Sequence, residues 1–201
     1  MDFTTVKKNL TDLGYLVSCF DTAKEAADYL KNAIQNCTVG FGGSVTLQDM
    51  GLYEALSENN TVFWHWQLKE GETADDARRN AQTAEVYLSS VNGMAETGEI
   101  VNIDGACNRV SAIFYGHRKV YLVVGSNKIK ADYEQALSHA RNVAAPKNAQ
   151  RLKRNTPCAA KADRCYNCKS PDRICRGLSV LWGKPMIGEF EIILIDEPLG
   201  Y

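Results

Sequence analysis

The chain has 201 residues, 45% of them hydrophobic, which is the composition of one ordinary globular domain with a real core. It has no run of 18 apolar residues and no apolar stretch at its N-terminus, so we expect no membrane span, no secretory signal and a cytoplasmic protein. The net charge of -1 is uneven, because residues 147–176 carry nine basic and two acidic side chains. Such a segment suits an anionic ligand or a negatively charged metal centre.

Helical and strand-like patterns alternate along the chain. In chain order they predict a helix over residues 3–13, a strand over 15–20, a helix over 22–34, a strand over 38–41, a helix over 46–56, a strand over 61–66, a helix over 72–84, strands over 86–91 and 99–103, a short helix from Arg109, a strand over 119–125, a helix over 133–143, and strands over 178–182 and 190–196. This alternation predicts an α/β fold in one domain over residues 1–201, with a Rossmann-like, largely parallel sheet flanked by helices. In such sheets ligands bind beyond the carboxyl ends of the strands.

A glycine-containing loop follows the second predicted strand. Gly42 and Gly43 permit close approach of the backbone, and Ser44 and Thr46 add hydroxyl groups. We expect Thr46 and Asp49 to form the capping box of the next helix. The free N–H groups at the start of that helix suit an anion such as phosphate or carboxylate, and the alternative is a tight turn with an ordinary cap.

A second polar loop lies between apolar strands at residues 92–109. Its chemistry-bearing residues are Glu96, Thr97, Gly98, Asn102, Asp104, Asn108 and Arg109. Arg109 is suited to bind a carboxylate or phosphate through two hydrogen bonds, and Glu96 is suited to act as a general base or nucleophile. The alternative is a solvated hairpin with an Asp-Gly turn at Asp104.

Four of the seven cysteines lie near the end of the sequence with the spacing C-x6-C-x2-C-x6-C. They are Cys158, Cys165, Cys168 and Cys175. Four thiolates complete a tetrahedral shell, C-x2-C is a usual chelate spacing, and the segment has little apolar material for a core of its own. We therefore predict a metal centre in a Cys-rich basic segment, residues 147–176, inserted toward the C-terminal end of the fold, with free thiols or disulfides as the alternative. The histidines, of which His65 is one, have no ligand-spaced partner, and we expect them to be structural.

The stretches GFGGSVTLQDMG, AETGEIVNIDGACNRVSAIFYGHRKVYLVVGSNKI and IILIDEPLGY together resemble the LUD-domain family, the lactate-utilisation proteins formerly called DUF162. The resemblance spans residues 5–201 and implies a fold related to ribose-5-phosphate isomerase, glucosamine-6-phosphate deaminase and the CoA transferases. In those folds a glycine-rich loop and an acidic loop face each other across the ligand. Here the resemblance implies two facing groups: Gly42, Gly43, Ser44 and Thr46 opposite Glu96, Thr97 and Gly98.

The resemblance also bears on the metal and on function. The family is associated with lactate oxidation through an iron–sulfur complex, which implies a [4Fe–4S] cluster at the cysteines ahead of zinc. The first interpretation is a protein that binds a small anionic metabolite and takes part in redox metabolism, as an oxidoreductase component with an electron-transfer partner protein. Whether it is catalytic by itself stays open.

Two other interpretations remain. One is a transferase or isomerase acting on an anionic metabolite, such as a sugar phosphate or acyl-CoA, with Glu96 as base, Arg109 as anchor and a structural zinc. The other is a binding module that docks a partner through its basic segment. The absence of nucleic-acid-binding motifs argues against a nucleic-acid partner.

Overall fold

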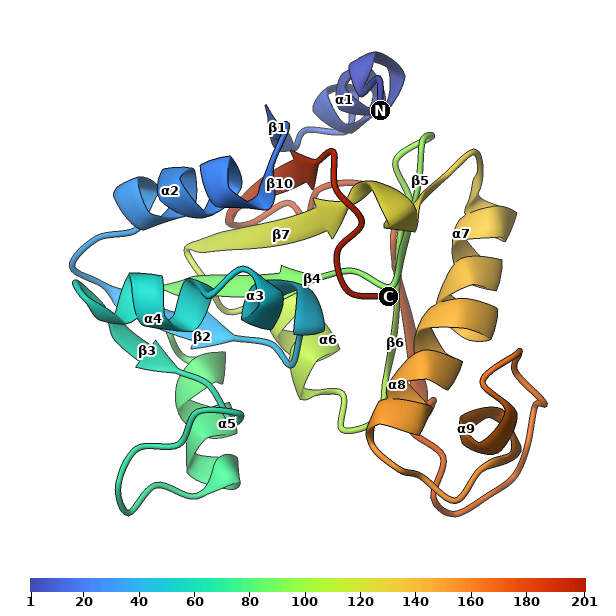
Figure 1. Ribbon diagram of the computed structural model, residues 1–201. Helices are drawn as coiled ribbons and strands as arrows, with labels where there is room; N and C mark the ends of the chain where they lie inside the picture. The colour runs from blue at the N-terminus through green and yellow to red at the C-terminus, as the bar shows by residue number, and fades with distance from the viewer.

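The centre of the protein is a parallel sheet. A computed structural model, which describes residues 1–201, has six strands in the order β1-β10-β7-β4-β2-β3 (Figure 1). Their bounds are β1 Leu16–Phe20, β2 Thr38–Phe41, β3 Thr61–Phe63, β4 Val86–Ser90, β7 Lys119–Gly125 and β10 Glu189–Ile195. All neighbouring strands pair in parallel. The predicted α/β class with a largely parallel sheet is therefore confirmed, and burial on both faces explains the near-continuous apolar runs of β7 and β10.

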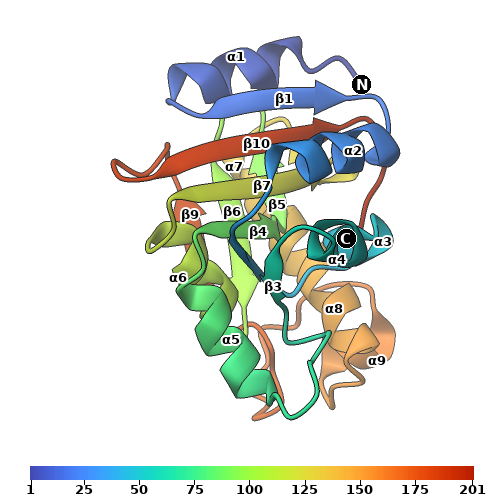
Figure 2. The same cartoon turned by 90° about the vertical axis from the view of Figure 1, so that its left-hand side faces the viewer.

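Helices cover both faces of this sheet, as Figure 2 shows in a view turned by 90°. Their bounds are α1 Thr4–Asp12, α2 Ala23–Ala33, α3 Val45–Asp49, α4 Leu52–Ser57, α5 Ala74–Gln82 and α6 Asn108–Phe114. One face of the sheet packs against α1, α5 and α6, and the other packs against α2, α3 and α4. Leu10 of α1 and Leu30 of α2 are fully buried, as the helical spacing of the apolar residues predicts.

A second sheet of four strands stands beside the first, in the order β8-β5-β6-β9. Its strands are β5 Gly93–Ala95, β6 Ile100–Asp104, β8 Ile129–Lys130 and β9 Gly177–Leu181. β5 and β6 form an antiparallel hairpin, β9 pairs antiparallel with β6, and β8 pairs parallel with β5. The sequence pattern predicts β6 and β9 but neither β5 nor β8, because strands of three and two residues are too short to show a period.

One long helical stretch covers the second sheet. It comprises α7 Tyr133–His139, a π-helical turn at Ala140–Ala144 and α8 Ala145–Arg151. Ala136 and Ala140 pack in an apolar cluster with residues of the β5–β6 hairpin. Pro146 in the first turn of α8 has no N–H to donate to the carbonyl four residues back, and the π turn directly before it takes up this irregularity.

The helix predicted over residues 46–56 differs from the structure at its start and in its middle. Ser44 is the N-cap, because its hydroxyl accepts a hydrogen bond from the N–H of Leu47, so the prediction of Thr46 as the cap is wrong. The hydroxyl of Thr46 instead accepts a hydrogen bond from Lys128. Gly51, with a φ of 62°, separates the predicted single helix into α3 and α4.

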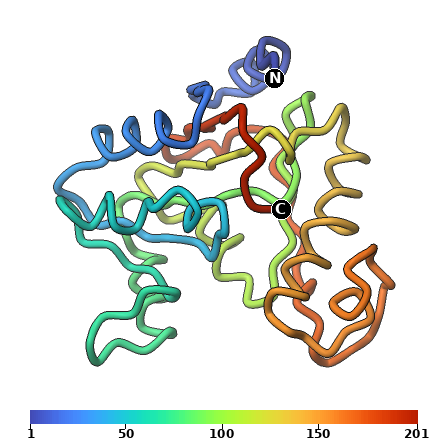
Figure 3. The backbone as a smooth tube through the Cα atoms, in the orientation of Figure 1, coloured from blue at the N-terminus to red at the C-terminus, as the bar shows by residue number.

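The Cys-rich basic segment begins within α8 and continues to the start of β9. Its regular element after α8 is α9 Pro157–Lys161, which begins where the Thr156 hydroxyl accepts from the N–H of Ala159. Residues 162–176 follow as turns and irregular backbone. The backbone trace in Figure 3 shows this part as a lobe beside α8. None of the helices combines the length and the apolar character that crossing a bilayer requires.

Candidate functional site

A cavity of about 600 Å³, hereafter the strand-end pocket, lies at the carboxyl ends of the central strands. Its lining includes Gly43 and Ser44 after β2, Ser90 and Asn92 at the end of β4, and Lys128 after β7. β2 and β4 are neighbours in the sheet. The chain continues from β2 to β3 on one side of this pair, and from β4 to β7 on the opposite side. The pocket therefore lies at the reversal of strand order where α/β proteins bind their ligands.

Two glycines after β2 allow side chains to approach the backbone. A Cβ at Gly42 would lie 2.9 Å from Cγ of Arg109 and 2.9 Å from Oγ of Ser89, so a larger residue does not fit there. A Cβ at Gly43 would lie 3.2 Å from the ring of Trp66. Gly43 lines the pocket and Gly42 does not, so Gly42 serves the packing of Arg109 rather than direct contact with a ligand.

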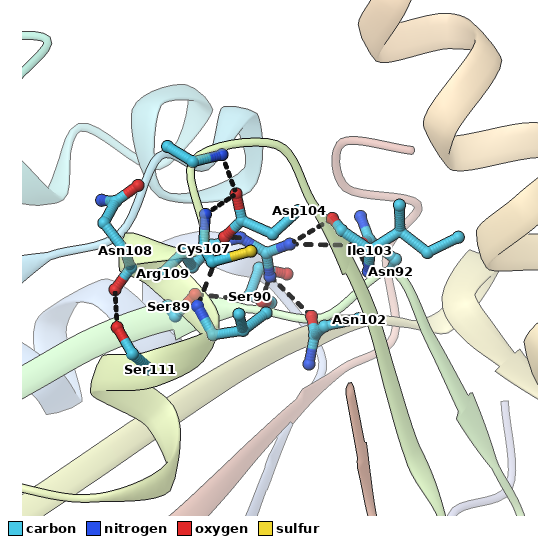
Figure 4. Close-up of polar contacts among 12 residues, drawn as sticks. Ser89, Ser90, Asn92, Asn102, Ile103, Asp104, Cys107, Asn108, Arg109 and Ser111 are labelled. Atoms are coloured by element: carbon cyan, nitrogen blue, oxygen red, sulfur yellow. Dashed lines mark hydrogen bonds and ion pairs between the residues drawn. The ribbon is translucent and has the colours of Figure 1, made fainter. Parts of the chain in front are cut away.

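Arg109 is the centre of a buried polar network (Figure 4). Its guanidinium donates to four acceptors: Ser90 O at 3.1 Å, Asn102 Oδ1 at 2.6 Å, Asn92 Oδ1 at 3.0 Å and Ile103 O at 2.9 Å. Its Nε lies 3.8 Å from Oδ2 of Asp104. Burial lowers the pKa of Arg109, and the carboxylate of Asp104 opposes that shift. This network fixes the end of β4 to β6 and to α6.

Arg109 is therefore committed to acceptors of the chain itself. Arg109 lines the pocket, but both Nη atoms already donate to side-chain and backbone oxygens, so the predicted two hydrogen bonds to a carboxylate or phosphate would have to replace these contacts. Asp104 lines the pocket but also accepts from backbone N–H groups around the start of α6. Asn102 is buried behind the pocket, while Asn108 lines it.

Glu96, Thr97 and Gly98 lie at the turn of the β5–β6 hairpin. The carbonyl of Glu96 accepts from Nδ2 of Asn9 in α1 at 2.7 Å, and a Cβ at Gly98 would meet the side chain of Leu13. None of the three residues lines the strand-end pocket. The prediction that they face the glycine loop across a ligand is wrong, because the turn of the hairpin packs against α1 and only its open end reaches the pocket.

Lys128 is a buried lysine in the pocket lining, with 3% of its surface exposed. Its Nζ donates to Oγ1 of Thr46 and to Oγ of Ser90, each at 2.8 Å. Burial, reinforced by the charge of Arg109, lowers the pKa of Lys128 to about 7, and Asp49 opposes this shift. The amine is thus present in both its charged and its neutral form near neutral pH.

Five more arginines lie in the lining. They are Arg78, Arg151, Arg154, Arg173 and Arg176. The Nε atoms of Arg78 and Arg173 are buried and have no hydrogen-bond acceptor in the protein. The only side-chain carboxylates in the lining belong to Asp104 and Asp172. Because a buried donor without an acceptor is costly, these arginines suit an anion.

His65 and Trp66 complete the wall beside α5. Burial, reinforced by the charge of Arg78, lowers the pKa of His65 to about 4, so its imidazole is neutral at pH 7. The ring of Trp66 stacks on Trp64 at 5.3 Å, and the guanidinium of Arg151 lies 4.7 Å from a Trp66 ring centre. This wall therefore offers an aromatic surface next to positive charge.

The sequence pattern proposed Gly43, Ser44, Thr46, Asp104, Asn108 and Arg109 for a site, and all six lie in the lining, but it named none of the other basic residues. The one signal was the excess of basic residues at 147–176, from which Arg151, Arg154, Arg173 and Arg176 come. The place of Arg78 and Lys128 in the lining could not be predicted from the sequence pattern, since each is an isolated basic residue whose position depends on tertiary packing.

A second cavity, of about 280 Å³ and hereafter the cysteine cavity, lies between the helical stretch of α7 and α8 and the part of the Cys-rich basic segment that follows α8. Cys158, Cys165 and Cys175 line it. Cys168 does not, but its carbonyl accepts from Arg173, which also donates to Sγ of Cys175 at 3.2 Å. All four thiols are free and half-buried. Three of the four predicted ligands therefore face one space.

The four thiols do not converge on one point. No group of three or more His, Cys, Asp or Glu side chains is close enough together to hold a single metal ion. In a zinc site, Zn–S bonds of about 2.3 Å draw the thiolates to about 4 Å from one another. Burial opposes ionisation of Cys165, but the N–H of Asn167 and the guanidinium of Arg141 outweigh it and lower the pKa of this thiol.

The strand-end pocket and the cysteine cavity share a wall. The residues that line both are Ile103, Ala145, Arg173, Ile174 and Arg176. Arg173 thus contacts a thiol on one side and lines the arginine-rich pocket on the other. Because only the side chain of Arg173 separates the two cavities here, a change of charge in one cavity acts electrostatically on groups in the other cavity.

The parallel sheet and the strand-end pocket define a Rossmann-like α/β protein. The sequence profile of the LUD domain matches residues 4–195, so the chain belongs to the LUD-domain family and the predicted resemblance is confirmed. A DUF162 family protein from Deinococcus radiodurans has a similar structure, with a TM-score of 0.55, 12% sequence identity and coverage of 95% of this chain and 94% of that chain. At this identity the likeness concerns the fold alone. No curated protein shows significant sequence similarity to the chain.

Proposed function

We propose that this LUD-domain protein binds a small anionic metabolite in the strand-end pocket and takes part in redox metabolism of the lactate-utilisation type, with a metal centre at its four late cysteines. The observation that carries the proposal is the wall shared by the strand-end pocket and the cysteine cavity. A metabolite on one side and a redox centre on the other would be separated by single side chains. Such closeness suits the exchange of electrons between them.

The charge of the strand-end pocket supports an anionic ligand. Seven basic and two acidic side chains line it. Arg109 donates to four acceptors of the chain, whereas Arg78, Arg154 and Arg176 each donate to one. Arg78 and Arg173 each keep a buried Nε without an acceptor. A carboxylate or phosphate would supply the oxygens that these groups lack.

The arrangement of the thiols supports an iron–sulfur cluster ahead of a single zinc ion. Zinc requires thiolates about 4 Å apart, whereas three of these four thiols line a cavity of about 280 Å³ and the fourth, that of Cys168, does not. A [4Fe–4S] cluster is wider than one ion, and its ligands would be Cys158, Cys165, Cys168 and Cys175. When bound, such a cluster supplies one-electron transfer. Arg141 and Arg173, which also line the cavity, would offset its negative charge.

Protein purified without oxygen tests the metal centre. We expect a brown preparation whose visible absorbance bleaches on reduction, with about four iron and four sulfide per chain. Cys158→Ser and Cys175→Ser should lose the colour, whereas Cys19→Ser, in strand β1, should keep it. A colourless protein with one zinc per chain would support structural zinc instead, and a protein with neither metal would remove the centre from the proposal.

Calorimetric titration with lactate, pyruvate and phosphate tests the pocket separately from the metal. We expect at least one of these anions to bind, and Arg176→Ala to weaken that binding because Arg176 lines the pocket. Arg79→Ala removes the same charge from the exposed face of α5 and should bind like the wild type. Equal affinities for the wild type and both variants would show that the anion does not occupy this pocket.

We also propose that an electron-transfer partner protein docks on the Cys-rich basic segment. Lys161, Arg164 and Lys169 are exposed and lie close in sequence to the cysteines. Because complementary charge speeds the encounter of two proteins, we expect an acidic partner whose association slows as salt is added. An association rate that does not change with salt would contradict this docking mode.

The transferase or isomerase alternative, with a sugar phosphate or acyl-CoA as substrate and a structural zinc, has less support. Its base was Glu96, which lies beside α1 and outside the pocket. Its anchor was Arg109, which is occupied by acceptors of the chain. Turnover of such a metabolite by the wild type, abolished by Glu96→Gln, would restore this alternative.

A further inference from the structure

The side chain of Lys128 has the surroundings of a reactive amine. We propose that Lys128 forms an imine with a carbonyl compound that carries an anionic group and binds in the strand-end pocket. The inference rests on the proposed anion binding and adds a covalent step to it. Three independent features of the structure support it: the hydrogen bonds of the amine, the charges around it and its place in the pocket lining.

The hydrogen bonds of Lys128 match a neutral amine. Its Nζ donates to Oγ1 of Thr46 and Oγ of Ser90, each at 2.8 Å. Both hydroxyls have already given their own protons to carbonyls, Ser90 to Val123 O at 2.6 Å and Thr46 to Leu199 O at 3.3 Å. A neutral amine has two N–H groups for these two acceptors and keeps its lone pair free. An ammonium would keep a third N–H without an acceptor in the chain, which is costly for a buried group.

The charges around Lys128 favour the same form. No side-chain carboxylate forms an ion pair with it, and burial together with the charge of Arg109 lowers its pKa to about 7, against the opposing effect of Asp49. The neighbouring His139 is itself kept neutral at pH 7, because burial and the charges of Lys130 and Lys128 lower its pKa to about 4. An ordinary lysine has fewer than about one neutral amine in a thousand at pH 7. A substantial fraction of Lys128 is therefore in the nucleophilic form at physiological pH.

The position of Lys128 suits an anionic carbonyl substrate. Lys128 lines the same pocket as Arg78 and Arg173, each of which keeps a buried Nε without an acceptor in the chain. The arginines would hold the anionic group, which leaves the carbonyl to meet the amine. In the step itself, Nζ attacks the carbonyl carbon and forms a C–N bond. The resulting carbinolamine then loses its oxygen as one water molecule and becomes a C=N imine, without any change in oxidation state.

Reductive trapping tests this inference on the full-length protein. Pyruvate and dihydroxyacetone phosphate are the probes, one with a carboxylate and one with a phosphate, and cyanoborohydride converts an imine into a stable secondary amine. Peptide mass spectrometry should find one adduct, on Lys128, formed at least about tenfold faster than on any other lysine. The probe that reacts faster identifies the anionic group that the pocket prefers. The rate should rise as the pH increases through about 7, following the neutral fraction of Lys128.

Matched controls separate chemistry from structure. Lactate and glycerol 3-phosphate carry the same anionic groups without the carbonyl, so they should slow trapping by competition. Lys128→Arg keeps a cation but cannot form the imine, and no adduct should form at that position. Lys130→Arg changes a half-buried lysine outside the pocket, whose Nζ donates to Asn127 O at 2.8 Å, and trapping should match the wild type. The wild-type pH profile needs no variant to fold.

Two results would overturn the inference, and they are distinguishable. If pyruvate and phosphate bind in the calorimetric titration but adducts form only on exposed lysines, Lys128 is not the nucleophile and the proposed anion binding stands. If none of the anions binds, both proposals fail together.

Discussion

The two walls of the strand-end pocket are built differently. On the sheet side, Arg109 gives both Nη atoms to acceptors of the chain and is buried among regular elements. On the other side, Arg173 lies in irregular backbone, contacts a carbonyl and a thiol, and keeps its Nε unpaired. The contrast indicates that the sheet wall maintains the shape of the pocket, while the Cys-rich wall keeps hydrogen-bonding capacity for a ligand.

Replacing Arg109, the centre of the polar network on the sheet side of the pocket, should have the largest effect on the free energy of unfolding. Arg109→Met should lower the free energy of unfolding by about 3–5 kcal/mol, because it leaves Asn102 and the carbonyl of Ile103 without donors and a carboxylate without its counter-charge. Urea denaturation measures this loss. Arg79→Met, at an exposed position in α5, should change it little. A similar small change for Arg109→Met would show that the network is not structural.

The pH dependence of stability comes next in size, and it concerns Lys128 on the sheet side. The pKa of this amine is about 10.5 when the chain is unfolded and about 7 in the folded protein. Between these values the unfolded chain binds more protons, so the free energy of unfolding rises with pH, by up to about 1.4 kcal/mol per pH unit. The destabilisation is complete below pH 7 and is lost as the pH approaches 10.5.

Denaturation of the wild type and Lys128→Met at a series of pH values measures this contribution. The difference in unfolding free energy should shift in favour of the wild type from pH 7 to pH 10. Lys130→Met is the matched control outside the pocket, and its curve should follow the wild type more closely. Parallel curves for the wild type and Lys128→Met would contradict a lowered pKa.

A change on the Cys-rich wall should affect binding more than stability. Arg173→Ala should weaken anion binding about tenfold, or about 1.4 kcal/mol, because it removes a charged donor with an unpaired Nε. Arg164→Ala removes the same charge from the same segment at a position outside both cavities, and its affinity should be unchanged. If both variants lose affinity equally, the effect is general charge and not contact with the ligand.

The smallest expected effect concerns the start of α3. Ser44→Ala should cost about 1 kcal/mol of stability, since it removes the acceptor for the N–H of Leu47. Asp49→Ala should cost less, because the capping box that the sequence predicts there is not formed. Thermal unfolding of the two variants compares them directly, and the reverse order would restore the sequence-based prediction.

The central sheet was predictable because burial on both faces requires continuous apolar runs, as in β7 and β10. The site was less predictable, since residues 92–109 form one polar cluster in sequence but two in space. The hairpin carries Glu96 to its turn and Asn92 to its open end, and only packing of the turn against α1 decides which end meets the pocket. The burial of Lys128 likewise depends on neighbours distant in sequence, Thr46 and Ser90. Contacts between residues so distant in sequence cannot be predicted from the pattern of neighbouring residues.

The cysteines show a different limit of sequence analysis. Their spacing predicts a shared centre, and three of them do line one cavity. The irregular backbone of residues 162–176 has no period from which the direction of each thiol could be derived. Spacing therefore predicts which residues gather, but not whether they are arranged for one ion or for a wider cluster.

The π-helical turn at Ala140–Ala144 has a consequence for both cavities. Such a turn contains one residue more than an α-helical turn, which rotates everything after it by about 100° around the helix axis. Leu137, before the turn, lines the cysteine cavity, as do Pro146 and Ala149 after it, while Asn148 and Arg151 line the strand-end pocket. The rotation of the helix about its axis thus determines which of its side chains line the strand-end pocket and which line the cysteine cavity. Deleting a single residue within the turn would rotate Arg151 away from the ring of Trp66, and would change which side chains of α8 face each cavity.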